Sequence, residues 1–442
     1  MIGRNVAVLG LLVAVICCAQ PASVLTVDDA VTLALKGNRE VLSAALEVDR
    51  AREDTAALRT KRLPQFQIFA LGGVPLTRAT ATVPTGALGT YPGTGPIPGP
   101  NVSVTTPRQL SGVIVGQALQ PVSQLWKIHL DLISSRIREE AAQQRLRQKR
   151  QETAQSVRQL YDQIAQTQAQ IESAEAEEKT LAELQIETDR KLVELAVLKS
   201  DSLDVRARLS RQRYQLVKLR DSGKTQKETF NRLLGRDLRT EFSVELEPLP
   251  APEEIELTGA QNLALRRRPE IQEARLQTKK AENDVRRQRA EYIPDISTGL
   301  TYAAFPNVSF LPQNFAIAGF VLQWQPFDWG EKRHKMRSLG AAVKQATLSE
   351  RDAEQQIVLD VNSKFRALAE ARMRLDTTAL TQEAQRETLR ETMNRYREKA
   401  VLLSGALQQQ TAMVQADSDY QDALAAFWKA KADFDRALGR EY

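Results

Sequence analysis

The chain is poor in the residues that build metal, redox and phosphate sites. Among its 442 residues are two histidines, His129 and His334, and two cysteines, Cys17 and Cys18, which are adjacent near the N-terminus. The histidines do not show metal-ligand spacing, and the sequence contains no glycine-rich phosphate-binding loop. The sequence therefore predicts no catalytic, cofactor-binding or metal-binding residue, and we expect a protein that is not an enzyme.

Aromatic residues and long apolar runs are also scarce. Aromatic residues make up 5% of the chain, whereas charged residues make up 26%. The formal net charge of +6 is small for this length, and basic residues alternate with acidic ones, so no nucleic-acid-binding surface is indicated. Beyond the N-terminal segment no run reaches the 18 apolar residues that predict a membrane-spanning helix. This composition favours long helices and coiled coils over a globular enzyme.

Residues 1–19 are predicted to be a secretory signal peptide. Arg4 supplies positive charge, residues 6–16 form a short apolar run, and Cys17–Ala19 is a small-residue cleavage site. A lipoprotein signal would have glycine, alanine or serine before the cysteine, but Ile16 stands there, so the residues do not favour lipidation. We expect an exported protein whose mature chain, from about Gln20, contains no cysteine.

The chain is an internal duplication, with a first repeat predicted at 20–240 and a second at 241–442. The matched segments are 30–64 with 260–294 at a shift of 230, 120–121 with 325–326 at a shift of 205, and 234–236 with 438–440 at a shift of 204. The fall from 230 to 205 means that the first repeat carries 25 more residues between Pro64 and Gln120. Most of the extra residues lie in the Thr-, Gly- and Pro-rich segment Thr77–Pro107, which predicts a long loop, where insertion costs little.

Each repeat is predicted to contain a short helix, a second helix that ends at a proline, two strands and two long helices. Apolar residues alternate with polar ones in the strands, a pattern that fits both a transmembrane β-barrel and a half-exposed sheet of a soluble domain. The expected strands are at about 65–75, 110–120, 295–304 and 314–325, and the expected long helices at about 127–198, 201–235, 330–400 and 405–439. Breaks between long helices are expected near Leu198–Asp201 and Leu402–Gly405.

Spacings of three and four residues in the first long helix predict a coiled-coil seam, with one polar member. The seam residues are Ala154, Val157, Tyr161, Ile164, Gln168 and Ile171. Trp126, Trp324 and Trp329 lie where strands are followed by helices, which is typical of membrane-interface aromatics and also of packing at a domain junction. Four strands cannot close a barrel, and an open edge is not stable in lipid, so membrane strands would require an oligomer. A trimer of 12 strands, unlike a dimer of eight, leaves room for a lumen.

Motifs in both repeats resemble the TolC-type outer membrane efflux protein family over nearly all of the mature chain. The repeat openings, the helix-to-strand switches and the exit from the last strand carry this resemblance, and both repeats close on Leu-Gly. The motifs are Ala34–Val41 and Ala264–Ile271, Leu63-Pro64 and Ile293-Pro294, and Gln325–Gly330. Arg39 departs from the proline that is usual in the family.

The resemblance implies a mainly α fold with a membrane β-barrel. It implies a homotrimer with a 12-stranded barrel in the outer membrane of a Gram-negative-type bacterium and a long α-helical tunnel in the periplasm. The implied function is the outer membrane channel of a tripartite efflux system, a passive exit duct for substrates delivered by an inner-membrane pump through a periplasmic adaptor. Two alternatives are the outer membrane duct of a type I protein-secretion system and a soluble periplasmic coiled-coil adaptor or scaffold.

The resemblance also places the periplasmic entrance and the adaptor contact at the two helix-hairpin tips. Asp201 and Asp204 either form a ring of like charge in a trimer, which would set ion preference, or cap the returning helix. The apolar tip residues either contact the adaptor or pack within the hairpins. The residues assigned to the tips are Val197, Leu198, Lys199, Ser200, Asp201, Asp204, Val401, Leu402, Leu403, Ser404, Gly405 and Gln408.

Overall fold

The computed structural model describes most of the chain after the predicted signal peptide, which lies outside the described residues. The described ranges are 23–74, 76–78, 80–105, 108–195, 197–245, 256–307, 313–398 and 400–440. The chain divides into two compact units, which are considered separately below. Unit 1 comprises Met1–Ser43, Arg147–Arg268 and Gln356–Tyr442, and unit 2 comprises Ala44–Leu146 and Pro269–Gln355.

The duplication reappears in the bounds of the helices. The first repeat contains α1 (Val27–Gly37), α2 (Arg39–Thr60), α3 (Gln124–Val193) and α4 (Lys199–Leu234), and the second contains α5 (Leu257–Arg267), α6 (Pro269–Ala290), α7 (Glu331–Arg397) and α8 (Leu403–Ala437). At the predicted shift of 230, α1 and α2 coincide with α5 and α6 in both bounds. The ends of α3 and α7, and the starts of α4 and α8, are 204 residues apart. None of the described helices contains an 18-residue window apolar enough to cross a membrane.

The breaks between the long helices lie a few residues earlier than the sequence predicts. α3 ends at Val193 rather than near 198, and α4 already begins at Lys199. Asp201, taken as part of the break, lies in the first turn of α4, where its carboxylate accepts a hydrogen bond from the Leu198 amide at 3.4 Å. Small polar residues stabilise a helix start as readily as they interrupt a helix, because they satisfy its free amides. Leu195, with φ of 58°, lies in the turn itself.

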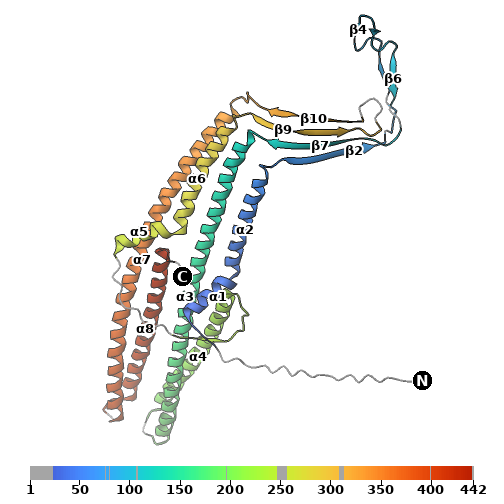
Figure 1. Ribbon diagram of the computed structural model, residues 1–442. Coiled ribbons are helices and arrows are strands. Elements are labelled where there is room, and N and C mark those ends of the chain that lie inside the picture. Colours follow the sequence, from blue (N-terminus) through green and yellow to red (C-terminus); the bar gives the residue numbers. More distant parts are fainter. Residues whose placement is uncertain are drawn as a thin grey trace, which may run out of the picture. The chain divides into compact units, whose positions relative to one another are not determined.

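Four strands of unit 2 form one antiparallel sheet, in the order β10–β9–β7–β2 (Figure 1). The strands are β2 (Gln65–Gly73), β7 (Ser111–Pro121), β9 (Asp295–Ala304) and β10 (Asn314–Gln323). The helix-to-strand switches at Pro64 and Pro294 lie directly before β2 and β9, because proline cannot continue a helix. Each repeat contributes one hairpin, and β7 joins the hairpins by pairing with β9. The predicted alternation of helices with strand pairs is confirmed.

The middle of α3 lies in the core of unit 1. Val157 and Ile164 are almost fully buried against α1 and against Phe230 of α4. Tyr161 is 2% exposed, and its hydroxyl donates to the Leu25 carbonyl oxygen at 2.9 Å. The predicted seam is thus buried as far as Ile164, but it packs against several elements rather than against one matching seam. These include the parallel strands β1 (Ser23–Leu25) and β8 (Phe242–Val244), which are too short to leave a periodic pattern.

The predicted loop Thr77–Pro107 is a folded β structure over its described residues. β3 (Thr80–Val83) pairs with β6 (Val102–Thr105), and β4 (Thr90–Tyr91) pairs with β5 (Gly95–Pro96). These strands form two small separate sheets, both apart from the four-stranded sheet. Proline and glycine exclude helix and central strand, as expected, but they are compatible with short two-stranded ladders joined by tight turns.

Candidate functional site

The two faces of the four-stranded sheet differ in chemistry. The registers place Phe66, Ala118, Leu300 and Ala318 in one row across the four strands. Large apolar side chains on this face are exposed, among them Phe66 (78%), Ile68 (82%), Leu300 (49%), Phe320 (76%) and Leu322 (55%). The opposite face carries the row Gln67, Gln117 and Thr301 together with further apolar residues. One apolar face beside one mixed face is typical of strands between lipid and a lumen.

Both outer strands of the sheet have an unpaired edge. β2 pairs with β7 alone, and β10 pairs with β9 alone, among the described residues. Each strand therefore presents backbone amide and carbonyl groups without partners along its outer side. Such groups must be satisfied in lipid, where no water replaces the missing partner. A four-stranded sheet with two open edges is therefore not complete by itself in a membrane.

The three predicted interface tryptophans lie in unit 2 and are all exposed. Trp126 is in the first turn of α3 and is 54% exposed, Trp324 follows β10 and is 56% exposed, and Trp329 is 89% exposed. Trp329 adopts a φ of 53° and makes an edge-to-face contact with Phe327, with ring centroids 4.7 Å apart. More than half of each of these residues is exposed in the single chain.

The predicted contact residues at the hairpin tips of unit 1 differ in how far they are exposed. Leu198 and Leu402 are the N-cap residues of α4 and α8 and are 70% and 79% exposed. Leu403, by contrast, is 8% exposed and packs with Val205 and Leu407 between the two hairpins. Hairpin packing therefore accounts for Leu403, while the two exposed leucines are free to meet a partner. Val197, Val401 and Gly405 are half-buried, and Lys199, Ser200, Ser404 and Gln408 are exposed.

The acidic residues of the first tip are held by local interactions. Asp201 accepts from the Leu198 amide, as described above, whereas Asp204 forms an ion pair with Arg208, with Nε and Oδ2 3.1 Å apart. Nearby, the hydrogen bond from Ser202 together with that from Arg206 holds the pKa of Asp189 below its ordinary value. A hydrogen bond from an amide leaves the negative charge of Asp201 in place, whereas the Arg208 guanidinium offsets the charge of Asp204.

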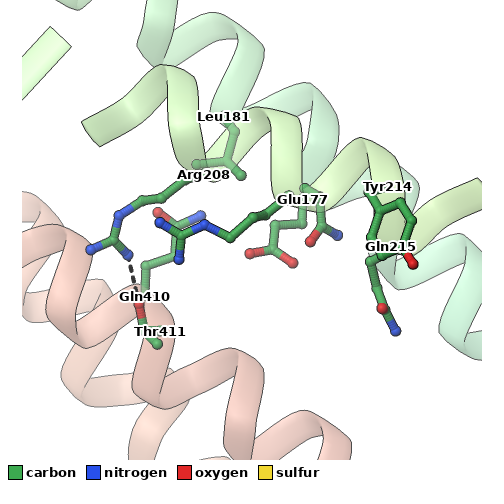
Figure 2. A pocket seen from close by; sticks show the side chains of 9 residues that line it. Glu177, Leu181, Arg208, Tyr214, Gln215, Gln410 and Thr411 are labelled. Carbon is green, nitrogen blue, oxygen red and sulfur yellow. Dashed lines mark hydrogen bonds between the residues drawn. The ribbon is translucent and has the colours of Figure 1, made fainter. Parts of the chain in front are cut away.

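A groove of roughly 390 Å³ lies between the first hairpin and α8, all within unit 1 (Figure 2). Arg208 of α4 reaches across it and donates to the Thr411 hydroxyl at 2.8 Å. Burial raises the pKa of the Glu177 carboxyl on α3, and the negative charge of Asp417 on α8 raises it further. The ionised form of Glu177 is therefore disfavoured in the contact between the two hairpins.

The sequence did not point to these groove residues. Glu177, Arg208, Thr411 and Asp417 are ordinary polar positions on long amphipathic helices. Helical periodicity groups residues by face, but it does not say which hairpin a face meets. The duplication gives no signal here either, because a match between α4 and α8 in sequence does not say that these two equivalent helices contact each other. Among the described residues, no group of three or more His, Cys, Asp or Glu side chains is placed to hold a metal ion.

Comparison with known proteins relates part of the sequence to one family and the whole fold to solved channels. The family model described as "Outer membrane efflux protein" matches residues 260–440, which is most of the second repeat. No curated protein sequence matches the chain. Several solved outer membrane channels share its fold at low sequence identity. Similarity at this level of identity establishes the fold only.

Three of these channels span nearly the whole chain. The outer-membrane channel OprN is 20% identical with a TM-score of 0.74, and the match covers 93% of this chain and 89% of that one. The CmeC outer membrane channel of Campylobacter jejuni is 15% identical with a TM-score of 0.76, covering 93% and 85%. The open state of the MtrE outer membrane channel of Neisseria gonorrhoeae is 16% identical with a TM-score of 0.72, covering 93% and 88%.

The duplicated fold, with one strand pair per repeat and paired long helices, is that of outer membrane channel subunits. The second repeat matches the model of the outer membrane efflux protein family, the family that the sequence motifs of both repeats resemble.

Proposed function

We propose that this chain is the outer membrane channel of a tripartite efflux system. Three copies form a 12-stranded barrel and a helical tunnel, and substrates pass through them passively after an inner-membrane pump delivers them by way of a periplasmic adaptor. The channel supplies a route and no catalytic step. The adaptor and pump belong to the proposal because members of this family work with such partners.

The observation that carries this proposal is the sheet with two unpaired edges and an exposed apolar face. A soluble adaptor or scaffold would not expose Phe66, Ile68 and Phe320 to water on one continuous face. Lipid accounts for the face, and neighbouring copies account for the edges of β2 and β10. The exposed Trp126, Trp324 and Trp329 are assigned to the membrane interface, where an apolar ring with a polar edge is favoured.

Substitution of Leu300 by lysine tests the membrane sheet. Leu300 lies near the middle of β9 on the apolar face, where a lysine at the bilayer midplane costs about 2 kcal/mol or more per copy. We expect Leu300→Lys to reduce the heat-modifiable, trimer-sized species in the outer membrane fraction severalfold. The measurement is gel electrophoresis of detergent-extracted outer membranes with and without heating.

Thr301→Lys is the matched control. Thr301 is the next residue of β9 and lies on the opposite face, opposite Gln117. Under the proposal it faces the lumen, so the trimer-sized species should persist. Equal tolerance of both lysines, or release of the unmodified protein by osmotic shock, would overturn the channel proposal and favour a soluble adaptor.

We further propose that the exposed residues of the two tips, Leu198 and Leu402 above all, receive the adaptor, and that Asp201 supplies the charge at the entrance. The Asp201 carboxylate accepts a hydrogen bond from the Leu198 amide, and a trimer repeats this residue three times. Asp201→Asn is then expected to lower the cation-over-anion permeability ratio about twofold or more, because the ring of charge is lost. Asp204→Asn should change it little, since Arg208 already offsets that charge. Reversal potentials of single channels in a salt gradient give the permeability ratio. An unchanged ratio in Asp201→Asn would refute the proposed ring of charge.

A further inference from the structure

The segment between Arg78 and Arg108, the outer extension, contains no charged residue and no histidine. The extension therefore differs in composition from the whole chain, of which 26% is charged. The extension is nevertheless folded where it is described. The Leu88 amide donates to the Ile97 carbonyl oxygen at 2.9 Å, and the Thr85 amide donates to the Asn101 side chain at 2.8 Å. The extension is therefore an ordered element, and the chemistry of its exposed surface can indicate what it contacts.

The β3–β6 ladder at the base of this extension has two unlike faces. On one face, hydroxyl groups pair across the strands: Thr80 with Thr105 at 3.1 Å, and Thr82 with Ser103 at 3.2 Å. Because side chains alternate along a strand, the residues between them lie on the other face. These are Ala81, Val83, Val102 and Val104, which the register places opposite one another. That second face, the valine face, is entirely apolar.

The described part of the chain covers the valine face only in part. Val102 is 42% exposed, Ala81 is exposed, and Val83 and Val104 are only half-buried. An isolated two-stranded ladder is at best marginally stable in water, and it needs packing on its apolar face to persist. A free face of this kind, with no charge around it, is also an aggregation hazard unless a partner covers it. We therefore expect an apolar partner to cover the valine face.

The position of the extension points to another copy of the chain as that partner. The extension connects β2, which has an unpaired edge, to β7, so it stands at the outer end of the surface where copies meet. Like copies can approach closely here because no like charges repel each other. Twelve strands spaced about 4.8 Å apart and tilted about 40° give a barrel radius of roughly 12 Å. One arm of the extension, with more than ten residues at up to about 3.3 Å each, can reach the barrel axis.

We propose that the outer extensions of the copies pack against one another through their valine faces, on the threefold axis at the outer mouth of the channel. This inference rests on the proposed trimer and adds a contact that the barrel strands do not make. Three valine faces around the axis would cover one another and leave the Thr80, Thr82, Ser103 and Thr105 hydroxyls facing water. The contact makes the extension an inter-copy collar over the exit.

Cysteine cross-linking at adjacent residues of β6 tests the collar. The only native cysteines are Cys17 and Cys18, in the predicted signal peptide, so the unmodified protein is the blank. Val104→Cys places a thiol on the valine face, and Ser103→Cys places a nearly isosteric thiol on the hydroxyl face. With mild oxidant on intact outer membranes, Val104→Cys should give covalent dimer on the order of ten times the amount given by Ser103→Cys, since disulfides form only between close thiols. Val83→Cys, on the valine face of the other strand, should behave like Val104→Cys.

The outcomes separate this inference from the proposed function. If the trimer-sized species is intact but neither Val104→Cys nor Val83→Cys cross-links with oxidant or with a short bis-maleimide, the collar is refuted and the channel stands. Equal cross-linking of Ser103→Cys would likewise refute a contact through the valine face. If the unmodified chain gives no trimer-sized species in the outer membrane, the proposed function itself fails.

Discussion

Replacing Gly235 by alanine is expected to destabilise unit 1 by about 3 kcal/mol or more per copy, because strain and overlap add at one position. Gly235 follows α4 in the left-handed conformation, with φ of 73°, and the Arg236 amide donates to the Asn231 carbonyl oxygen at 3.0 Å. Glycine is favoured at such a helix end because it has no Cβ. An added Cβ would also lie 2.0 Å from the Gly37 carbonyl oxygen, so backbone must move.

Gly340→Ala provides the comparison for this change. Gly340 lies inside α7, and an added Cβ there has no neighbour within 4 Å. Alanine is a better helix former than glycine, so this variant should be neutral or more stable by up to about 1 kcal/mol. The temperature at which the detergent-solubilised trimer dissociates measures both effects. Equal dissociation temperatures for Gly235→Ala and the unmodified protein would show that the junction between α1 and the end of α4 is not tightly packed.

The role of Gly235 could be predicted in part from the sequence. The repeated Leu-Gly-Arg at 234–236 and 438–440 marks two helix ends, and Gly439 indeed has a φ of 68°. The close approach to Gly37 could not be predicted, because it joins residues far apart in sequence. In the second repeat Arg267 occupies the place of Gly37, and a Cβ on Gly439 would lie 3.1 Å from the Arg267 Cβ. The motif and the place of contact are shared by the two repeats, but the approach is closer in the first repeat, 2.0 Å against 3.1 Å for an added Cβ.

Elements with a strong local signal were predictable, whereas contacts between elements were not. Proline before β2 and β9, alternation within the strands and the constant shift between repeats fix the alternation of helices and strand pairs. The start of α4 was misjudged because Ser200 and Asp201 fit a helix start as well as a break. At the tips, the sequence shows Leu402 and Leu403 as equal apolar neighbours. Only the packing of Leu403 against Val205 and Leu407 separates a buried residue from an exposed one.

Replacement of Lys127 by methionine is the second change that we expect to reduce stability strongly. It lies in the first turn of α3 with 8% of its side chain exposed, and its Nζ is 2.6 Å from Asp295 Oδ1 and 3.4 Å from Glu291 Oε2. It thereby links α3 to the end of α6 and the start of β9. Lys127→Met keeps the volume but leaves two carboxylates facing each other without their shared cation. Lys127 is buried, but both carboxylates are about a third exposed, so its removal is expected to cost about 1–3 kcal/mol per copy, between the values for surface and buried pairs.

Lys335→Met is the control for Lys127→Met, because both side chains of the Lys335–Glu331 pair are 59% exposed and such a pair contributes little. The effect of Lys127 should also depend on pH. Burial raises the pKa of Glu291, but the hydrogen bond and charge of Arg287, with the charge of Lys127, outweigh this and lower it below its ordinary value of 4.5. A lowered pKa stabilises the fold above about 4.5, and this contribution is lost as the pH falls through the folded-state value.

The difference in dissociation temperature between the unmodified protein and Lys127→Met should therefore be largest near neutral pH and narrow below about pH 4.5, as protonation of Glu291 weakens its pairing with Lys127. Measurement of both proteins in detergent from pH 7 downward tests this. A difference that stays constant with pH would mean that Lys127 acts through the packing of its methylene chain and not through its charge.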